Sequence, residues 1–196
     1  MKNLLIAGVG GQGSLLASRI LGAACLSVGM DVKVSEVHGM SQRGGSVVTY
    51  VRAGDQVASP LIPEGEADLL IALEQLEALR WMGHVRPGGA VVMSTQIILP
   101  MPVITGQTAY PEGIADAVCG CGLQTYVVRA HDLAVGLGNA RVSNVVLLGA
   151  ASRLVGFAPE VWDEALRAAV KPKFLEINRQ AFALGRAALG AEEAAG

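Results

Sequence analysis

Gly8-Val9-Gly10-Gly11-Gln12-Gly13 is the stretch of this 196-residue chain that says most about its fold. An apolar run at residues 2–7 precedes it, and helix-forming residues follow it at 14–21. This order predicts a strand, a glycine turn and a helix. The spacing also satisfies the dinucleotide pattern G-x-G-x-x-G, which alone is a weak signal. A helix start presents free N–H groups and the positive end of the helix dipole, and both favour an anion.

A second glycine-rich stretch, His38-Gly39-Met40-Ser41-Gln42-Arg43-Gly44-Gly45, strengthens this interpretation. Ser41 and Gln42 offer neutral hydrogen bonds, and the planar fork of Arg43 suits a carboxylate or a phosphate. Consecutive backbone N–H groups at Gly44-Gly45 can form an anion-binding nest. Because this stretch leaves the end of the second expected strand, it should lie beside the first glycine turn. A surface loop with one solvated arginine is the alternative.

The two stretches together are the candidate binding site for an acidic ligand or partner. Three interpretations of the first turn stay open: a tight turn that needs glycine for positive φ, a contact with an anion or cofactor phosphate, and NAD binding. For NAD, Glu36 stands near the position of a ribose-binding carboxylate. The candidate binding residues are Gly8, Gly10, Gly11, Gln12, Gly13, Ser41, Gln42, Arg43, Gly44 and Gly45.

The interval between the second and third expected strands argues against a complete dinucleotide fold. Residues 31–37 alternate apolar and polar side chains, and residues 46–52 have strand composition, so both are expected strands. Only eight residues, 38–45, separate them. A right-handed crossover between parallel strands needs about a dozen residues or more, usually a helix. We therefore expect an antiparallel return at the third strand.

The rest of the chain predicts an α/β fold. We expect three layers and a mostly parallel sheet, with a Rossmann-like first β-α-β unit, at least one antiparallel strand and a helical C-terminus. The expected helices are 14–28, 74–82, 111–119 with Pro111 in the first turn, 144–154, 159–170 and 174–189; further strands are 3–7, 67–73, 90–94 and 124–129; Pro87-Gly88-Gly89 is a turn, and 95–110 is irregular.

Composition narrows the class of protein. Hydrophobic residues make up 52% of the chain and charged residues 16%, which leaves little polar surface. We expect some apolar surface to meet another subunit, although buried parallel strands account for part of the excess. The net charge of −2 gives nucleic-acid binding no electrostatic support. No uncharged run reaches the roughly 18 residues of a spanning helix, and the N-terminal apolar run is too short for a signal peptide, so we expect a cytoplasmic protein without membrane contact.

The cysteines and histidines suggest no metal site. Three cysteines, an odd number, argue against a disulfide framework and for a reducing compartment. Cys119-Gly120-Cys121 is a C-x-C pair, but an iron–sulfur cluster usually needs four thiolates, so we expect the cysteines to be small buried hydrophobic residues. The three histidines share no ligand spacing. His131-Asp132 suggests an acid–base pair, yet Asp132 is better explained as the cap of a following helix.

The paired loops resemble a known enzyme family. Gly-Val-Gly-Gly-Gln-Gly at 8–13 with Glu-Val-His-Gly-Met-Ser-Gln-Arg-Gly-Gly-Ser at 36–46 resembles the gamma module of 2-oxoacid:ferredoxin oxidoreductases. This form is most similar to the small (beta) subunits of the indolepyruvate enzymes. Residues 68–73, 144–149 and 178–182 continue the resemblance, which implies one gamma-type catalytic domain over residues 1–190 and a frayed tail at 191–196.

The resemblance also implies a reaction and partners. The family oxidatively decarboxylates a 2-oxo acid, here indolepyruvate or another aryl pyruvate, with coenzyme A to acyl-CoA, CO2 and reduced ferredoxin. Thiamine diphosphate and [4Fe–4S] clusters belong to the large (alpha) subunit, so this chain alone is expected to bind no cofactor, to contribute no catalytic residue and to be inactive by itself. The alternatives are a stand-alone NAD- or FAD-binding oxidoreductase and a non-catalytic structural subunit. The loops have three possible targets: coenzyme A, another nucleotide or the partner subunit.

Overall fold

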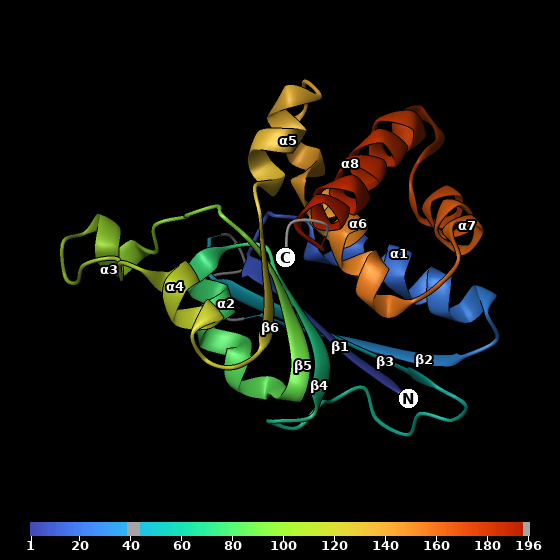
Figure 1. The fold of residues 1–196 in the computed structure, drawn as a ribbon, viewed down its shortest axis with the longest axis horizontal. Coiled ribbons are helices and arrows are strands. Elements are labelled where there is room, and N and C mark those ends of the chain that lie inside the picture. The colour runs from blue at the N-terminus through green and yellow to red at the C-terminus, as the bar shows by residue number, and fades with distance from the viewer. Residues whose placement is uncertain (39–43, 194–196) are drawn as a thin grey trace.

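The computed structural model describes residues 1–38 and 44–193, with side chains to residue 189. A six-stranded sheet stands between two helical layers (Figure 1). Its strands, in the spatial order β2-β3-β1-β4-β5-β6, are β1 (Lys2–Val9), β2 (Asp31–His38), β3 (Ser46–Gly54), β4 (Ala67–Ala72), β5 (Val85–Ser94) and β6 (Gln124–Val128).

The helices divide between the two faces of the sheet. Helices α1, α6, α7 and α8 cover one face and α2 and α4 cover the other, while α5 stands at the edge between them (Figure 1). The bounds are α1 (Ser14–Ser27), α2 (Gln75–Trp81), α3 (Met101–Ile104), α4 (Ile114–Cys119), α5 (Ala130–Gly136), α6 (Ser143–Val155), α7 (Pro159–Ala169) and α8 (Leu175–Glu193), with short 3-10 helices η1 (Met82–His84), η2 (Ala140–Val142) and η3 (Pro172–Phe174).

The expected antiparallel return is confirmed. Strand β3 pairs antiparallel with β2, where Ser35 faces Tyr50, and also antiparallel with β1, where Leu5 faces Tyr50. Strands β1, β4, β5 and β6 are parallel to one another. The expected fold class is therefore correct, but β3 separates β2 from β1. In the dinucleotide fold those two strands are neighbours.

The face covered by α1, α6, α7 and α8 has the larger apolar core. Ile20, Leu147 and Trp162 are among its fully buried side chains. Helices α6 and α8 come so close that glycine is required at their crossing. A Cβ on Gly185 would lie 1.8 Å from the Val146 carbonyl oxygen, and one on Gly149 would lie 2.2 Å from that of Phe182. Neither distance is possible for a side-chain carbon, so backbone meets backbone here.

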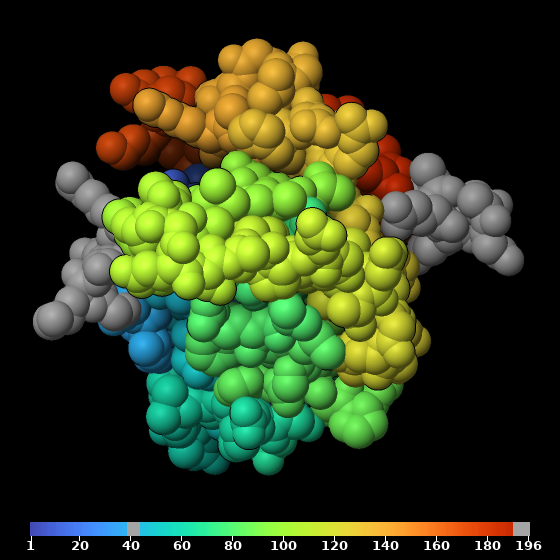
Figure 2. All heavy atoms as spheres, turned by 90° about the vertical axis from the view of Figure 1, so that its left-hand side faces the viewer, coloured from blue at the N-terminus to red at the C-terminus, as the bar shows by residue number. Residues whose placement is uncertain are grey.

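The other face has a smaller core and a projecting segment. Residues 95–110, which we call the arm, leave β5 and return to α4 with the short helix α3 between them. The arm exposes Ile97, Leu99, Met101 and Ile104. Figure 2 shows it as a lime-green band beneath α5. This is apolar surface of the kind expected to meet another subunit.

Three local expectations were wrong. Helix α4 begins at Ile114 rather than near Pro111, because Gly113 has φ 65° and its left-handed conformation breaks the chain direction first. The expected turn at 87–89 lies inside β5 as a bulge: Ala67 pairs with Val85, but Leu69 pairs with Ala90. Helix α5 was not expected, and Asp132 does not cap it; that carboxylate forms an ion pair of 2.8 Å with Arg129.

The C-x-C cysteines also differ from expectation. Cys25 is buried as expected, whereas Cys119 and Cys121 are exposed. Helix α4 directs Ile114 and Val118 toward the core, so the next residue, Cys119, faces outward. Helix α8 extends to Glu193, and the end of the expected tail, 194–196, lies outside the described residues. Within the described ranges, no helix has the length and apolarity needed to cross a lipid bilayer.

Candidate functional site

The two glycine stretches meet directly, as their positions predicted. The Gly10 N–H donates to the Gly45 carbonyl at 2.9 Å, and the Gly44 N–H donates to the Gly10 carbonyl at 3.3 Å. These bonds continue the β1–β3 ladder beyond the pair Val9–Ser46. The remaining candidates of the second stretch, Ser41, Gln42 and Arg43, lie outside the described residues.

The first stretch places the start of α1 at this junction. Gly11 has φ 105° and Gly13 has φ 86°, conformations that side-chain-bearing residues rarely adopt. The Gly13 carbonyl accepts the N–H groups of Leu16 and Ala17, which begins the helix. No hydrogen bond among the described residues engages the N–H groups of Gly11, Gly13 or Ser14. The first turn of α1 also carries no acidic residue, so the positive end of its dipole is uncompensated.

Gln12 holds the turn in place through its side chain. Its Oε1 accepts the Val9 N–H at 2.7 Å, while its Nε2 donates to the Leu73 carbonyl at 2.9 Å and to Oε1 of Gln96 at 3.0 Å. The amide therefore joins the ends of β1 and β4 to the beginning of the arm. Gln12 acts on the site by positioning it, and direct contact with a ligand stays a prediction.

Asn144, at the start of α6, fixes the turn from the opposite side. Its Nδ2 donates to the Gly13 carbonyl at 2.9 Å, and its Oδ1 accepts the Val145 N–H at 2.9 Å. A Cβ on Gly13 would lie 2.4 Å from that Nδ2. Gly13 is thus needed both for its φ angle and for this contact. Asn144 was noted within the resemblance, but no pattern in the sequence indicated that it would meet the first glycine turn.

A cavity of about 580 Å³ opens at this junction, and we call it the glycine cavity. Gly10, Gly11, Gln12, Gly13 and Gly44 line it, whereas Gly8 and Gly45 are not among the lining residues. Gly8 serves packing, since a Cβ there would lie 2.9 Å from Oε1 of Gln12. The lining residues that sequence reasoning missed come from the arm, α5, η2 and α6: Gln96, Ile98, His131, Arg141, Ser143 and Asn144.

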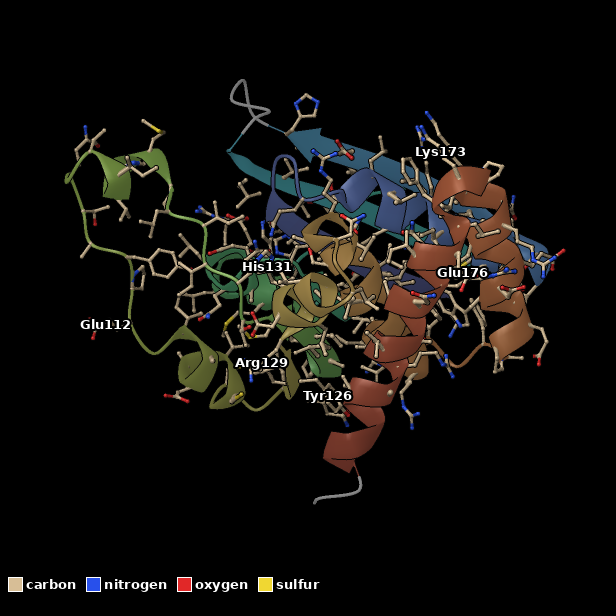
Figure 3. The ribbon with its side chains drawn as sticks, turned by 90° about the horizontal axis from the view of Figure 1, so that it is seen from above. Glu112, Tyr126, Arg129, His131, Lys173 and Glu176 are labelled. Carbon is tan, nitrogen blue, oxygen red and sulfur yellow. The ribbon has the colours of Figure 1, made fainter. Side chains whose placement is uncertain are left out.

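The chemistry of the cavity favours binding of an anion. Its polar lining consists of backbone N–H groups, amides, Ser143, His131 and the cation Arg141, with no acidic side chain among the described lining residues. Figure 3 shows His131 at the start of α5, above the carboxyl edge of the sheet. Arg141 has no acidic partner in the described part of the chain. Backbone donors, a helix start and an arginine together suit a phosphate or a carboxylate.

Two other candidate chemistries gain no support. Glu36 lies on β2 opposite Thr49 of β3, which is in turn opposite Ile6 of β1, so β3 separates Glu36 from β1 and Glu36 lies level with Ile6 rather than with the glycine turn. This position disfavours a ribose contact and hence NAD binding. Across residues 1–38 and 44–193, no three side chains of His, Cys, Asp or Glu gather as a metal site.

Comparison with known proteins places the chain among oxidoreductase subunits. A family model described as pyruvate ferredoxin/flavodoxin oxidoreductase matches residues 3–188. The chain is 42% identical over 190 residues to the indolepyruvate oxidoreductase subunit IorB of Thermococcus kodakarensis, covering 93% of both chains. It is 39% identical over 192 residues to IorB of Archaeoglobus fulgidus, covering 93% of this chain and 92% of that one.

Solved structures share the fold. The gamma subunit of a keto/oxoacid ferredoxin oxidoreductase from Geobacter sulfurreducens superposes with a TM-score of 0.73 at 25% identity, covering 97% of this chain and 99% of that one. A 2-oxoglutarate:ferredoxin oxidoreductase chain from Magnetococcus marinus gives a TM-score of 0.74 at 23% identity. The match covers 97% of this chain but 31% of that one, so the same fold there is part of a longer polypeptide.

Proposed function

Because the chain belongs to the pyruvate ferredoxin/flavodoxin oxidoreductase family, we propose that it is the small subunit of an aryl-pyruvate enzyme, with indolepyruvate as the favoured substrate. The enzyme would convert a 2-oxo acid and coenzyme A to an acyl-CoA, CO2 and reduced ferredoxin in the cytoplasm. Identity of 42% over 93% of both chains to an IorB subunit supports this substrate class over a 2-oxoglutarate synthase subunit, where identity is 28%. Residues 1–190 would form its single gamma-type domain.

In this proposal the redox cofactors belong to a larger partner subunit. A [4Fe–4S] cluster takes four thiolates, and this chain has three cysteines in all. Cys25 is buried in α1, and the other two lie on α4 and just after it. These residues do not fit a cluster, so electron transfer to ferredoxin would take place in the partner subunit. Thiamine diphosphate, which supplies the carbanion chemistry of decarboxylation when bound, would likewise sit in the partner.

This chain would contribute the glycine cavity to the complex. The observation that supports this role is the pair of hydrogen bonds that joins Gly10 to Gly44 and Gly45, next to N–H groups at the start of α1 that have no acceptor among the described residues. Such an arrangement would hold an anionic group of the complex, either a phosphate of coenzyme A or a carboxylate of the large subunit. Gln12 and Asn144 would keep the donors in position.

The arm supports the presence of a large partner beside this cavity. Gln96 and Ile98 of the arm line the cavity, while the neighbouring Ile97 and Leu99 are exposed. A subunit that covers these apolar side chains would also close the cavity against water.

Co-purification and assay test the subunit proposal. The chain should be expressed with its large subunit and assayed with indolepyruvate, coenzyme A and a viologen dye, alongside the chain alone. We expect turnover by the complex and none by the isolated chain, which should also lack thiamine and iron by mass spectrometry and metal analysis. Turnover by the isolated chain at the rate of the complex would contradict a subunit role.

Arg43 tests the anion assignment. Arg43→Ala should weaken coenzyme A use or complex formation by roughly 10- to 150-fold, because a charge-assisted hydrogen bond contributes about 1.5–3 kcal/mol. Arg43→Lys should restore part of the loss, since an ammonium lacks the planar fork. Titration with coenzyme A, and separately with the large subunit, identifies the target. Lys33→Ala, which removes an exposed cation of β2, is the control. Unchanged constants in both titrations would remove Arg43 from the site.

A further inference from the structure

A second cavity lies next to the glycine cavity, between α1, η2, the α7–η3 connection and α8. Its volume is about 500 Å³, within the range of small-molecule sites. Leu16, Val142, Val170, Phe174 and Ile177 give it an apolar wall. Three cations, Arg19, Arg141 and Lys171, line it from three different segments, and we call it the basic cavity. It shares Leu16 and Arg141 with the glycine cavity and no other lining residue.

The charges of the basic cavity are not compensated within the chain. None of its described lining residues is acidic, and no ion pair or side-chain hydrogen bond in the described ranges engages the charged groups of Arg19, Arg141 or Lys171. Glu176, at the start of α8 (Figure 3), bonds instead to Gln180 at 3.0 Å. Three like charges around one apolar hollow repel one another unless an anion joins them.

Ordinary helix electrostatics explains one of these cations and leaves two unexplained. Lys171 follows the C-terminal end of α7, where the helix dipole favours a positive charge. Arg141 precedes α6 and therefore stands at the positive end of that helix, where a cation is disfavoured. Arg19 lies in the N-terminal half of α1 with no acidic neighbour in the first turn. Both arginines are thus placed where a bound anion would stabilise them.

Asn178 of α8 adds an independent observation. It lines the basic cavity and is 4% exposed, and its Nδ2 donates to the Phe174 carbonyl at 2.7 Å. Its Oδ1 is buried and has no hydrogen-bond partner among the described residues. Buried side-chain oxygens are rarely left without a donor, because the loss of hydration is costly. Asn178 thus places a buried polar side chain with unused hydrogen-bonding capacity in the wall of the basic cavity.

We propose that the basic cavity binds an organic anion: a carboxylate or phosphate ester attached to an aromatic or aliphatic group. Arg19, Arg141 and Lys171 hold the anionic group, and the apolar part lies against Leu16, Val142 and Phe174. The apolar wall excludes a simple inorganic ion as the preferred ligand, because it would be left facing water. This site requires only this chain, so it stands apart from the proposed role of the glycine cavity.

The probe for this site is 1-anilinonaphthalene-8-sulfonate, an aromatic anion whose fluorescence rises in apolar surroundings. It is titrated into the full chain and into Arg19→Gln, Lys171→Gln and the double variant, none of which alters a lining residue of the glycine cavity. Each single change should raise Kd about 3- to 10-fold, and the double change more, because each removes one charge-assisted contact. Lys33→Gln on β2 should leave Kd unchanged and so controls for net charge.

Competition then identifies the chemistry of the ligand. We expect 1-naphthyl phosphate or 1-naphthylacetate to displace the probe, and whichever displaces it better distinguishes a phosphate ester from a carboxylate. Neutral 1-naphthol and inorganic phosphate should displace it poorly. Circular dichroism and thermal unfolding check that the variants are folded. A Kd for the double variant equal to that of wild type, or displacement by 1-naphthol as strong as by its anionic analogues, would overturn the proposal.

Discussion

Helices α1, α6, α7 and α8 cover one face of the sheet with apolar side chains, whereas α2, α4 and the arm cover the other around two buried carboxylates. On the first face, α6 and α8 touch through their backbones at Gly149 and Gly185. On the second, Glu74 and Glu77 are 1% and 3% exposed. Packing on the first face therefore requires glycine, which has no side chain, where α6 and α8 cross. On the second face, packing requires hydrogen bonds to buried carboxylates.

The carboxylates of the second face fasten the arm to the sheet. Glu74 accepts the Glu77 N–H at 3.0 Å as the cap of α2, the Ile98 N–H at 3.1 Å and the Tyr110 hydroxyl at 2.5 Å. Ile98 and Tyr110 lie near the two ends of the arm. Three donors compensate the burial of this charge, which would otherwise be costly. One carboxylate thus determines where the exposed apolar residues of the arm stand.

This contrast shows how a small subunit can be rigid on one side and shaped for contact on the other. The glycine cavity lies at the border between the two faces. Asn144 of the first face and Gln12, which bonds to Leu73 and Gln96, hold it from both sides. Substitutions on each face should therefore have different signatures, and the following experiments test that difference in order of expected size.

The largest effect should come from Gly185→Ala on the first face. The added methyl would lie 1.8 Å from the Val146 carbonyl oxygen, and a backbone atom cannot move aside cheaply. The helices must separate, so we expect a loss of about 3 kcal/mol or more in the free energy of unfolding, at the upper end of overpacking effects. Chemical denaturation monitored by circular dichroism measures this loss.

Gly136→Ala is the matched control for that experiment. Gly136 is also a helical glycine, but nothing lies within 4 Å of a Cβ built there. Its replacement should be neutral or stabilising by about 0.5–1 kcal/mol, because alanine restricts the unfolded chain and favours the helix. If Gly185→Ala behaves like Gly136→Ala, the close crossing of α6 and α8 is not what closes the first face.

A smaller loss is expected from Glu74→Ala on the second face. The change leaves the N–H groups of Glu77 and Ile98 and the hydroxyl of Tyr110 without their acceptor. We expect destabilisation of about 2–3 kcal/mol, together with faster proteolytic cleavage within the arm. Glu112→Ala removes an exposed carboxylate near the arm, labelled in Figure 3, and should change stability by less than about 0.5 kcal/mol. Equal cleavage rates in the two variants would show that Glu74 does not hold the arm.

The positions of the main strands along the chain and the antiparallel direction of β3 could be predicted from the sequence because local rules decide them, whereas the place of β3 between β2 and β1 could not. The glycine turn after residues 2–7 identified β1 and α1, and the short interval 38–45 required β3 to be antiparallel. Helices α6, α7 and α8 were expected at residues 144–154, 159–170 and 174–189, close to their observed bounds. The start of α4 and the existence of α5 were missed, because short helices depend on tertiary contacts more than on composition.

The candidate site was only half predictable. The two glycine stretches were expected to meet, and they do so because β3 begins just after the second stretch and pairs antiparallel with β1, which places the start of β3 beside the end of β1. The contributions of Asn144, His131 and Arg141 could not follow, because α5, η2 and α6 reach the cavity through long-range packing. Glu74 carried one local signal: it stands in the short interval between β4 and α2, as the N-cap of that helix. Its contacts with Ile98 and Tyr110 required the arm to fold back, which no local pattern specifies.

Tyr110→Phe tests the second face by pH. Burial, and then the hydrogen bond to Glu74, raises the pKa of Tyr110 above its ordinary value. The unfolded chain therefore loses this proton first, so the stabilisation is complete below about pH 10 and declines as pH rises further. The variant should lose about 1–2 kcal/mol at neutral pH. Between about pH 9 and pH 11 it should lose less stability than wild type; parallel declines would contradict this role.

The smallest effect is expected from chemical modification of the cysteines, which compares the accessibility of thiols on the two faces of the sheet. Cys25 is fully buried in α1 on the first face, and burial raises the pKa of its thiol to about 11. The raised pKa leaves little of this thiol as thiolate, the reactive form, at pH 8. Cys119 and Cys121 are exposed on the second face.

Iodoacetamide should thus modify two thiols of the native chain quickly, and the third only after unfolding, as mass spectrometry of intact protein and of its peptides would report. Cys25→Ala, which should show two modified thiols under both conditions, identifies the slow site. If Cys25 in the native chain reacts as fast as the other two, the first face opens readily, and it is not the more closely packed of the two faces.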